Sequence, residues 1–503
     1  MLRVAANRPS VRRKSRTHAA DEMGSARVRR QRKGSGVPRS ACRQAASLLA
    51  AALVSGALVA APAVVVRTAV VTFAGPFSSD VLRDVRVLRA HDNLDAATVR
   101  GTPLQLARLA HAPSVRGVAL DVPLRPNGHD GDDGDRSVLA WQRLGGDAGT
   151  RGAGAGVRVA LVDTGVADTA ALSRSSGRLV DGVDTSGSGT FGDGYGHGTF
   201  MAGIVAGGPV AGTNGRPVGV APGATVVSVK VADASGTTSL AKVVAGLDWV
   251  AGHASSLDVA SFSFSRTRPG RGYGPDPLTD AVERVRDAGV TVVVSAGNVP
   301  GEVGDPGFDP RVLTVGAADV RHGSARVASF SGSAVVAGVE KPDVVGSGVG
   351  VLSVLPPRSV IAREHPGARH GDALWRGSGT SEATAQAAGV VALYLSEHRD
   401  ATPSQVKTAI RNGARPLART HRDGAGLLRA GSLDEPGDDD CPGNGHGGGN
   451  DAGEGEGGFD ANSWSANSWS ANSWSANSWS ANSWSANSWS ANSWSTADWD
   501  AED

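Results

Sequence analysis

The sequence predicts an α/β fold for residues 137–432, with a mostly parallel β-sheet covered by helices on both faces. Two observations support this prediction. Short runs rich in valine and alanine alternate with longer segments of helical periodicity, and Gly is abundant, with 69 residues in 503. The strand-like runs are residues 157–163, 224–230, 259–264 and 291–294, and the helix-like segments are 239–253, 278–288 and one that begins at His197.

Residues 64–125 are predicted to form a smaller α+β unit that precedes this domain. Residues 64–73 contain the β-branched run of a strand, 103–109 fit a short amphipathic helix, and 115–121 fit a second strand. The Gly- and Asp-rich stretch 126–136 that follows is expected to be an exposed linker, open to proteolytic cleavage.

The N-terminus has the pattern of an export signal. Residues 1–43 contain 13 Lys or Arg against two acidic residues, and residues 45–66 follow as an almost uninterrupted apolar run. Ala61 and Ala63 have the small-residue spacing of a signal-peptidase site, so residues 1–63 are predicted to be a basic region and a signal peptide of a secreted protein. Because residues 45–66 are also long enough to span a bilayer, a membrane-anchored protein is the alternative.

The C-terminal part is predicted to be a disordered repeat tail. Residues 433–460 are an acidic, Gly-rich linker, and residues 461–503 contain seven copies of Ala-Asn-Ser-Trp-Ser. Each copy has one large apolar side chain, and a period of five residues is too short for a solenoid, so a packed core is not expected. The tail is expected either to contact cell-envelope polymers or a partner, or to act as a solvating spacer.

Cysteine usage and charge exclude several classes of function. The two cysteines, Cys42 and Cys441, lie outside the predicted α/β domain, which argues against a disulfide framework and against a thiol nucleophile. No Cys/His spacing fits a zinc site, and the nearly neutral central region gives no sign of a nucleic-acid groove. We therefore expect neither a cofactor required for catalysis nor a nucleic-acid partner.

Three segments of the α/β domain carry side chains that can act together in catalysis. Asp163 ends an apolar strand, and His197 and Ser381 each stand in a Gly-rich stretch where a helix begins. A serine hydroxyl becomes a useful nucleophile when a neighbouring histidine takes its proton, and a buried carboxylate orients that histidine. The carboxyl ends of parallel strands are where such groups converge.

A fourth segment can stabilise the negative charge that develops during acyl transfer. The strand-like run from residue 291 leads to Asn298, whose side-chain amide can donate to a tetrahedral oxyanion together with the backbone N–H of Ser381. Taken singly, each of the four residues fits a commoner structural role as a turn, cap or loop residue. Their joint occurrence is what indicates catalysis.

These motifs resemble those of the subtilisin-like serine peptidases. Asp163-Thr164-Gly165, Gly196-His197-Gly198-Thr199 and Gly379-Thr380-Ser381-Glu382-Ala383-Thr384 occur in the Asp, His, Ser order that this family uses. The resemblance covers about residues 137–432 and implies a serine endopeptidase that acts on proteins or peptides through Asp163, His197 and Ser381. It also implies that residues 64–125 are an inhibitory propeptide, so that the protein is made as a zymogen and binds its own propeptide.

The resemblance also implies which residues contact the substrate. Residues 259–265 resemble the family's substrate-binding strand, and residues 295–298 resemble its oxyanion-hole segment, with Asn298 as the donor. The implied substrate-binding residues are Ser261, Ser263, Phe264, Ser265, Ser295, Ala296 and Gly297. Family members often bind structural calcium, but the sequence contains no clear cluster of oxygen ligands to which a calcium ion can be assigned.

Several positions depart from the family pattern. Phe264 and Ser265 stand where Leu-Gly is usual, and the bulk of Ser265 would narrow the main specificity pocket. Glu382 replaces the usual Met beside the nucleophile, where its charge would shift the pH profile. The remaining departures are Phe200, Ala385 and Gln386.

Two other functions are alternatives to peptide hydrolysis. An α/β-hydrolase esterase needs Gly-x-Ser-x-Gly with the serine first in chain order, and Ser381 meets neither condition. A catalytically inactive relative that binds the cell envelope is the second alternative, and the presence of all four catalytic elements argues against it.

Overall fold

The computed structural model describes residues 65–76, 79–126, 136–266, 276–322, 324–336, 338–417 and 422–431. The predicted signal or anchor, most of the predicted linker and the C-terminal tail lie outside these residues. Within the described parts of the chain, none of the helices combines the length and the apolar character that crossing a membrane requires.

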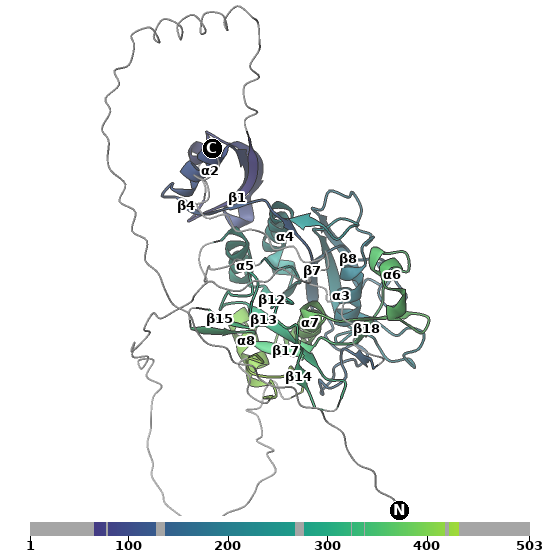
Figure 1. The fold of residues 1–503 in the computed structure, drawn as a ribbon. Helices are drawn as coiled ribbons and strands as arrows, with labels where there is room; N and C mark the ends of the chain where they lie inside the picture. Colours follow the sequence, from purple (N-terminus) through teal and green to yellow (C-terminus); the bar gives the residue numbers. More distant parts are fainter. Residues whose placement is uncertain are drawn as a thin grey trace, which may run out of the picture. The chain divides into compact units, whose positions relative to one another are not determined.

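An eight-stranded sheet forms the centre of the α/β domain (Figure 1). Every pairing within it is parallel except that of its edge strand β14 with β13, which confirms the predicted fold class. The strand order is β14 (Arg326–Val327), β13 (Leu313–Asp319), β12 (Thr291–Ser295), β11 (Val259–Phe262), β7 (Arg158–Asp163), β9 (Thr225–Lys230) and β8 (Leu179–Asp184), and β17 (Val344–Ser347) pairs with β13.

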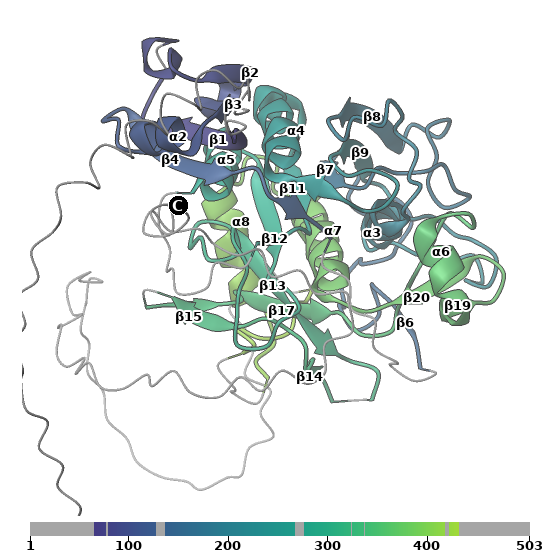
Figure 2. The same ribbon diagram turned by 45° about the horizontal axis from the view of Figure 1, so that its top comes forward.

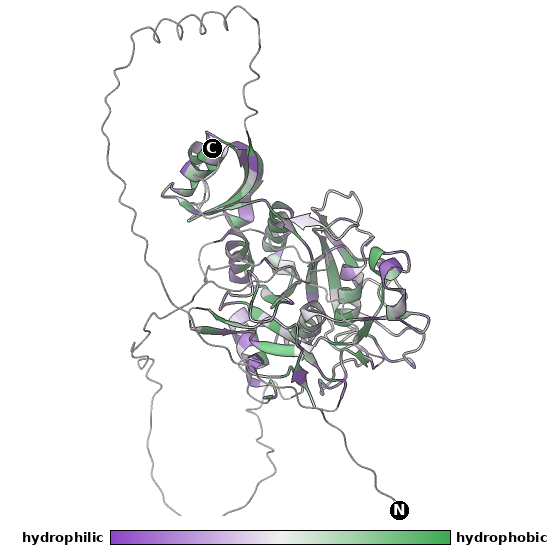
Figure 3. Cartoon of the chain, in the orientation of Figure 1, coloured by the Kyte–Doolittle hydropathy of each residue, from purple (hydrophilic) through white to green (hydrophobic). Residues whose placement is uncertain are grey.

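Helices cover both faces of this sheet (Figure 2). Because successive side chains of a strand point to opposite faces, β7 contributes to two cores. Val159 and Leu161 pack with α3 (His197–Ala206), α7 (Thr380–Glu397) and α8 (Pro403–Asn412). Ala160 and Val162 pack on the other face with α4 (Leu240–Gly252) and α5 (Pro277–Asp287). The strands are therefore apolar on both faces, as their colouring in Figure 3 shows.

A buried ion cluster joins α8 to the start of β17. The side chains of Lys341 and Asp343 are almost fully buried, with 2.9 Å between Lys341 Nζ and Asp343 Oδ2. Lys407 and Arg411 of α8 bind the other oxygen of Asp343 at 2.9 and 3.0 Å. A buried carboxylate thus has three cationic partners, all from the α/β domain.

Two smaller sheets and a short helix lie beside the main sheet. The predicted alternation of long strands and helices did not include them, because their strands are only two to four residues long. They consist of the pair β15 (Ala334–Val336) and β16 (Val339–Lys341), the sheet of β19 (Arg369–His370), β20 (Leu374–Gly377), β18 (Val351–Ser353) and β6 (Val138–Leu139), and the helix α6 (Val360–Glu364).

The N-terminal unit is a four-stranded antiparallel sheet with one helix packed on it. The strand order is β2 (Arg86–His91), β3 (Ala96–Gly101), β1 (Arg67–Phe73) and β4 (Val115–Leu120), with α2 (Pro103–Ala110) on the sheet. The two strands and the helix expected here are present, whereas β2 and β3 were missed. In β2, all residues except the last are exposed, so the strand shows no apolar alternation in the sequence.

Candidate active site

Asp163 and His197 form the centre of the candidate site. Asp163 is the last residue of β7, and His197 is the first residue of α3, which packs against that strand. His197 Nδ1 lies 2.8 Å from Asp163 Oδ1 and 2.9 Å from Oδ2. Both side chains are buried, so the carboxylate fixes the orientation of the imidazole.

The charges around His197 favour its protonated form. Burial by itself lowers the pKa of His197, but the negative charge and hydrogen bond of Asp163 raise it more, with smaller contributions from Glu382 and Asp193. The net pKa is above the usual value for histidine. A site of this kind stabilises the imidazolium that forms when the histidine takes a proton from a nucleophile.

Asp193, which the sequence analysis did not select, holds the loop in front of His197. Its carboxylate accepts hydrogen bonds from the Thr164 hydroxyl at 2.9 Å, from Gly196 N at 2.7 Å and from Thr199 N at 2.8 Å. Burial raises the pKa of Asp193, and the backbone donors oppose that rise. Its position shortly before a helix, where Asp commonly accepts backbone N–H groups, is the signal that could have identified it.

The backbone at Gly198, next to His197, also lies very close to the end of β7. A Cβ atom added to Gly198 would lie 3.2 Å from Asp163 Oδ1 and would overlap the carbonyl oxygen of Gly165. Gly198 N donates to the Thr164 hydroxyl at 2.9 Å. A residue with a side chain at this position would push His197 away from Asp163.

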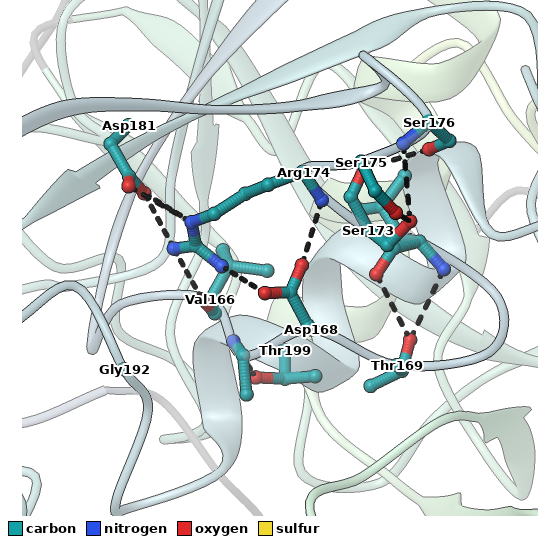
Figure 4. Close-up of polar contacts among 12 residues, drawn as sticks. Val166, Asp168, Thr169, Ser173, Arg174, Ser175, Ser176, Asp181, Gly192 and Thr199 are labelled. Carbon is teal, nitrogen blue, oxygen red and sulfur yellow. Dashed lines mark hydrogen bonds and ion pairs between the residues drawn. The ribbon is translucent and has the colours of Figure 1, made fainter.

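The loop that follows β7 is held by one arginine. Figure 4 shows Arg174 between Asp168 and Asp181, with Nε of Arg174 2.9 Å from both oxygens of Asp181. At the base of this loop, Ala167 N donates to the Thr199 hydroxyl at 3.0 Å. The loop is thereby fixed to the first turn of the helix that carries His197.

Lys230 is a second buried group that the sequence analysis missed. It pairs with Asp163 across β7 and β9, is 1% exposed, and donates from Nζ to the carbonyl oxygen of Gly192. Burial lowers the pKa of Lys230. Its contact with Gly192 supports the same loop that Asp193 organises.

Ser381 and Asn298 meet at the start of α7. Thr380 donates to Asn298 Oδ1 from its backbone N and from its hydroxyl, both at 2.9 Å. Because the carbonyl end of the Asn298 side chain is held in this way, its NH₂ end is the one that can donate to a substrate next to Ser381. Ser381 is the second residue of α7 and is fully buried.

The helices α3 and α7 pack against each other. A Cβ atom added to Gly377 would lie 2.6 Å from Glu382 Oε1 and 2.9 Å from Phe200 Cζ, so these two departures from the family pattern face the same glycine. The negative charge of Glu382 is one of the causes that raise the pKa of His197. His197 Nε2 is buried and has no hydrogen-bond partner within the described parts of the chain.

Two further departures, Gln386 and Ala385, have structural explanations. Gln386 accepts from Ser347 N at 2.7 Å and donates to the carbonyl oxygen of Ala140, so it links α7 to β17 and to the segment before β7. Ala385 is fully buried in the core shared by α3 and α7.

The predicted substrate-binding residues lie on two neighbouring segments. Ser261 pairs with Leu161 and Val293 inside the sheet, and residues 263–265 continue beyond the end of β11. Ser295 ends β12, and residues 296–298 follow it towards Ser381. The two segments therefore leave the same edge of the sheet side by side.

A segment from the N-terminal unit runs along this edge. The strand β5 (Pro123–Leu124) pairs antiparallel with β10 (Thr238–Ser239), and Pro126 forms an antiparallel bridge with Phe264. Leu124 is 5% exposed and packs in the core that contains Phe264. Residues 122–126 thus lie in an extended conformation between two parts of the α/β domain.

Polar contacts also join the N-terminal unit to α4 and α5. Arg116 binds Asp280 at 2.7 Å and Glu283 at 3.0 Å, and the Thr72 hydroxyl donates to Asp280. Burial raises the pKa of Asp280, although Thr72 and Arg116 act against it. On α4, Ala241 N donates to Asp121 Oδ1 at 2.8 Å.

Among the residues that the structure describes, no group of three or more His, Cys, Asp or Glu side chains is arranged to hold a metal ion.

Comparison with known proteins identifies the family. The model of the subtilase family, Peptidase_S8, matches residues 154–435. Serine protease AprX of Bacillus subtilis is 36% identical over 275 residues, which are 52% of this chain and 61% of AprX. Subtilisin Savinase of Lederbergia lenta is 31% identical over 279 residues, which are 55% of this chain and 90% of Savinase.

A solved structure supports the fold. The chain is similar to fervidolysin from Fervidobacterium pennivorans, a keratinolytic enzyme related to subtilisin, with a TM-score of 0.57 and 23% identity over 73% of this chain and 61% of that one. The chain spans about three fifths of the length of the first curated relatives it matches. Since the family model matches more than half of the sequence, the chain belongs to the subtilase family.

Proposed function

We propose that this protein is a serine endopeptidase that hydrolyses peptide bonds through Asp163, His197 and Ser381. The observation that carries the proposal is the Asp163–His197 pair, at 2.8 Å, with His197 on a helix that packs against α7, at whose start Thr380 orients the Asn298 amide. A carboxylate, an imidazole, a serine and an oriented amide are the groups that acyl transfer requires.

In the proposed mechanism each group has a step. His197 Nε2 takes the proton of the Ser381 hydroxyl as the serine oxygen attacks the scissile carbonyl, and Asp163 stabilises the resulting imidazolium through Nδ1. The oxyanion receives hydrogen bonds from Asn298 and from Ser381 N. His197 then protonates the leaving amine, and a water molecule, activated by the same imidazole, releases the acyl group from Ser381.

The protein is proposed to be a self-processing zymogen, with residues 64–125 as the inhibitory propeptide. Residues 122–126 support this role, because they occupy the edge along which residues 263–265 would bind an extended substrate. Cleavage in the linker 126–136 would separate the N-terminal unit from the peptidase.

Replacement of the proposed nucleophile tests both ideas. The full-length Ser381→Ala variant is expected to remain unprocessed and to leave a casein substrate intact. Ser396→Ala, later on the same helix, is the matched control and should be processed and active as the wild type is. Cleavage of casein by purified Ser381→Ala at the wild-type rate would overturn the proposed mechanism.

Export and the tail remain proposals from the sequence. N-terminal sequencing of protein recovered from the medium should give a start at or after Ala63 if residues 1–63 are a cleaved signal, whereas retention of residues 45–66 in the membrane fraction supports the anchor. Deletion of residues 436–503 should reduce binding to isolated cell walls if the repeats contact the envelope. Unchanged wall binding would support the spacer role.

A further inference from the structure

Two features show where the substrate residue on the N-terminal side of the scissile bond would lie. The bridge between Pro126 and Phe264 shows the direction of an extended chain along residues 263–265. Asn298 and Ser381 show where the scissile carbonyl must lie. The side chain attached next to that carbonyl therefore has to enter the space between residues 263–265 and residues 295–297.

Ser265 lies across this space. A Cβ atom added to Gly304 would overlap Ser265 Cβ and lie 2.7 Å from Ser265 Oγ, and one added to Gly297 would lie 3.5 Å from the same oxygen. Both side-chain atoms of Ser265 thus pack against glycines, which have no side chains of their own. With glycine at position 265, the same space would hold no side-chain atoms from this segment.

A buried ion cluster keeps Ser265 in this position. The next residue, Arg266, exchanges two backbone hydrogen bonds with Asp305, at 3.0 Å and 2.8 Å. Its guanidinium binds the carboxylates of Asp276 and Asp305, and Asp305 also accepts from the Thr279 hydroxyl. Arg266, Asp276 and Asp305 are each at most 9% exposed.

Opening the space would break this cluster. Moving residues 265 and 266 away from 304 and 305 would separate buried charges and leave them without partners, which costs several kcal/mol. The restriction imposed by Ser265 is therefore rigid, and a large side chain cannot be accommodated by a small shift of the loop.

We propose that Ser265 restricts the residue before the scissile bond to a small side chain, namely Gly, Ala or Ser, and that the Arg266–Asp276–Asp305 cluster makes this restriction rigid. The inference rests on the proposed peptidase function and specifies its substrate class. Ser265, which stands where Gly is usual, is on this account a determinant of specificity.

A series of quenched fluorescent peptides that differ only at this residue tests the inference. For the processed wild-type enzyme, kcat/KM with Ala is expected to exceed that with Leu or Phe at least about tenfold, since one or two kcal/mol separate side chains that fit from those that do not. Ser265→Gly should raise the Leu and Phe values about tenfold and change the Ala value little. Ser265→Ala keeps the Cβ atom and should keep the preference.

The controls separate the possible failures. Ser255→Gly, an exposed serine before the far end of the same strand, should leave the whole series unchanged. Equal cleavage after Ala, Leu and Phe by the wild type would overturn the restriction, as would an unchanged ratio in Ser265→Gly. Absence of cleavage of every peptide by processed wild-type protein would instead contradict the proposed function itself.

Discussion

Buried carboxylates occur in two regions of this molecule, and their partners differ in origin. Inside the α/β domain, Asp193 and Asp343 are held by backbone N–H groups, hydroxyls and cations of the same domain. At the contact with the N-terminal unit, Asp280 relies on Thr72 and Arg116, which come from residues 65–126. The contacts of Asp193 and Asp343 would persist if the N-terminal unit were removed, whereas Asp280 would lose Thr72 and Arg116.

Under the proposed function, this difference would separate catalysis from latency. The residues that orient His197 do not depend on the N-terminal unit, so its removal should leave the catalytic groups in place. The contact with α5 is built from groups that the two parts share, so it can be weakened without change to the catalytic groups.

The largest expected effect comes from a carboxylate whose partners all lie inside the α/β domain. Asp163→Asn removes the charge that stabilises the His197 imidazolium and allows the wrong tautomer, and it should lower kcat about 10⁴-fold. Steady-state kinetics on a peptide ester measures the loss. Asp168→Asn, on the neighbouring loop and more than half exposed, should stay within a few-fold of the wild type. A loss below tenfold for Asp163→Asn would show that Asp163 does not orient the base.

Asp343 tests how much a buried ion pair inside the α/β domain stabilises the fold, because this residue has no proposed role in catalysis. Asp343→Asn leaves Lys341, with a fully buried side chain, next to a neutral partner, and should lower the free energy of unfolding by about 3–5 kcal/mol. Urea unfolding in the Ser381→Ala background avoids self-digestion. The comparison is Asp372→Asn, whose side chain is 95% exposed and whose loss should change stability by about 0.5 kcal/mol or less.

His91 makes the N-terminal unit sensitive to acid. It is fully buried, its Nε2 lies 2.8 Å from the Thr98 hydroxyl, and burial, with a smaller effect of Arg89, lowers its pKa from 6.5 to about 4. The folded unit therefore prefers neutral histidine. Its stability should be full above pH 6.5 and should decline as the pH falls from 6.5 to about 4, with a loss of about 3 kcal/mol in all.

Hydrogen exchange of β1 and β3 amides in full-length Ser381→Ala measures this decline, after correction for intrinsic exchange rates. His91→Gln should remove the pH dependence within this window. The exposed His111→Gln should retain it. If protection in the His91→Gln variant declined with acid as in its parent, another group would have to be the cause.

Arg116 tests the shared contact. Its side chain is 44% exposed, so solvent screens its pairs with Asp280 and Glu283, and Arg116→Met should weaken the hold of the N-terminal unit by about 1 kcal/mol or less. The measurable result is a shorter lag, up to about fivefold, before activity appears in freshly purified full-length protein. Arg108→Met, on the exposed side of α2, should keep the wild-type lag. An unchanged lag in Arg116→Met would mean that these pairs do not contribute to latency.

The smallest effect concerns Glu382. Its negative charge raises the pKa of His197, so Glu382→Gln should move the acid limb of the kcat/KM profile to lower pH, by about one unit or less. Glu397→Gln, at the other end of α7, should not move it. A shift to higher pH would contradict the proposed action of Glu382 on the imidazole.

The sequence predicted those features that depend on local patterns. The fold class followed from the apolar strands, and Asp163, His197 and Ser381 followed from short motifs whose residues are adjacent in the chain. Asp193 and Lys230 were missed because their roles arise from contacts with Thr164 and Gly192, which only the packed loop brings within reach. The pairs of Arg116 with Asp280 and of Ser265 with Gly304 join segments distant in the chain, and no periodicity or motif reports such contacts.

The strand formed by Pro123 and Leu124 has a consequence for how activity would begin. While the chain is uncut, this segment is tethered to the edge that it covers, and its local effective concentration is about millimolar, whatever the protein concentration. Cleavage of the linker removes the tether but leaves every contact in place. The cut N-terminal unit would then be an ordinary dissociable ligand whose occupancy falls with dilution, so that the proposed activity would be released as the protein spreads into a larger volume.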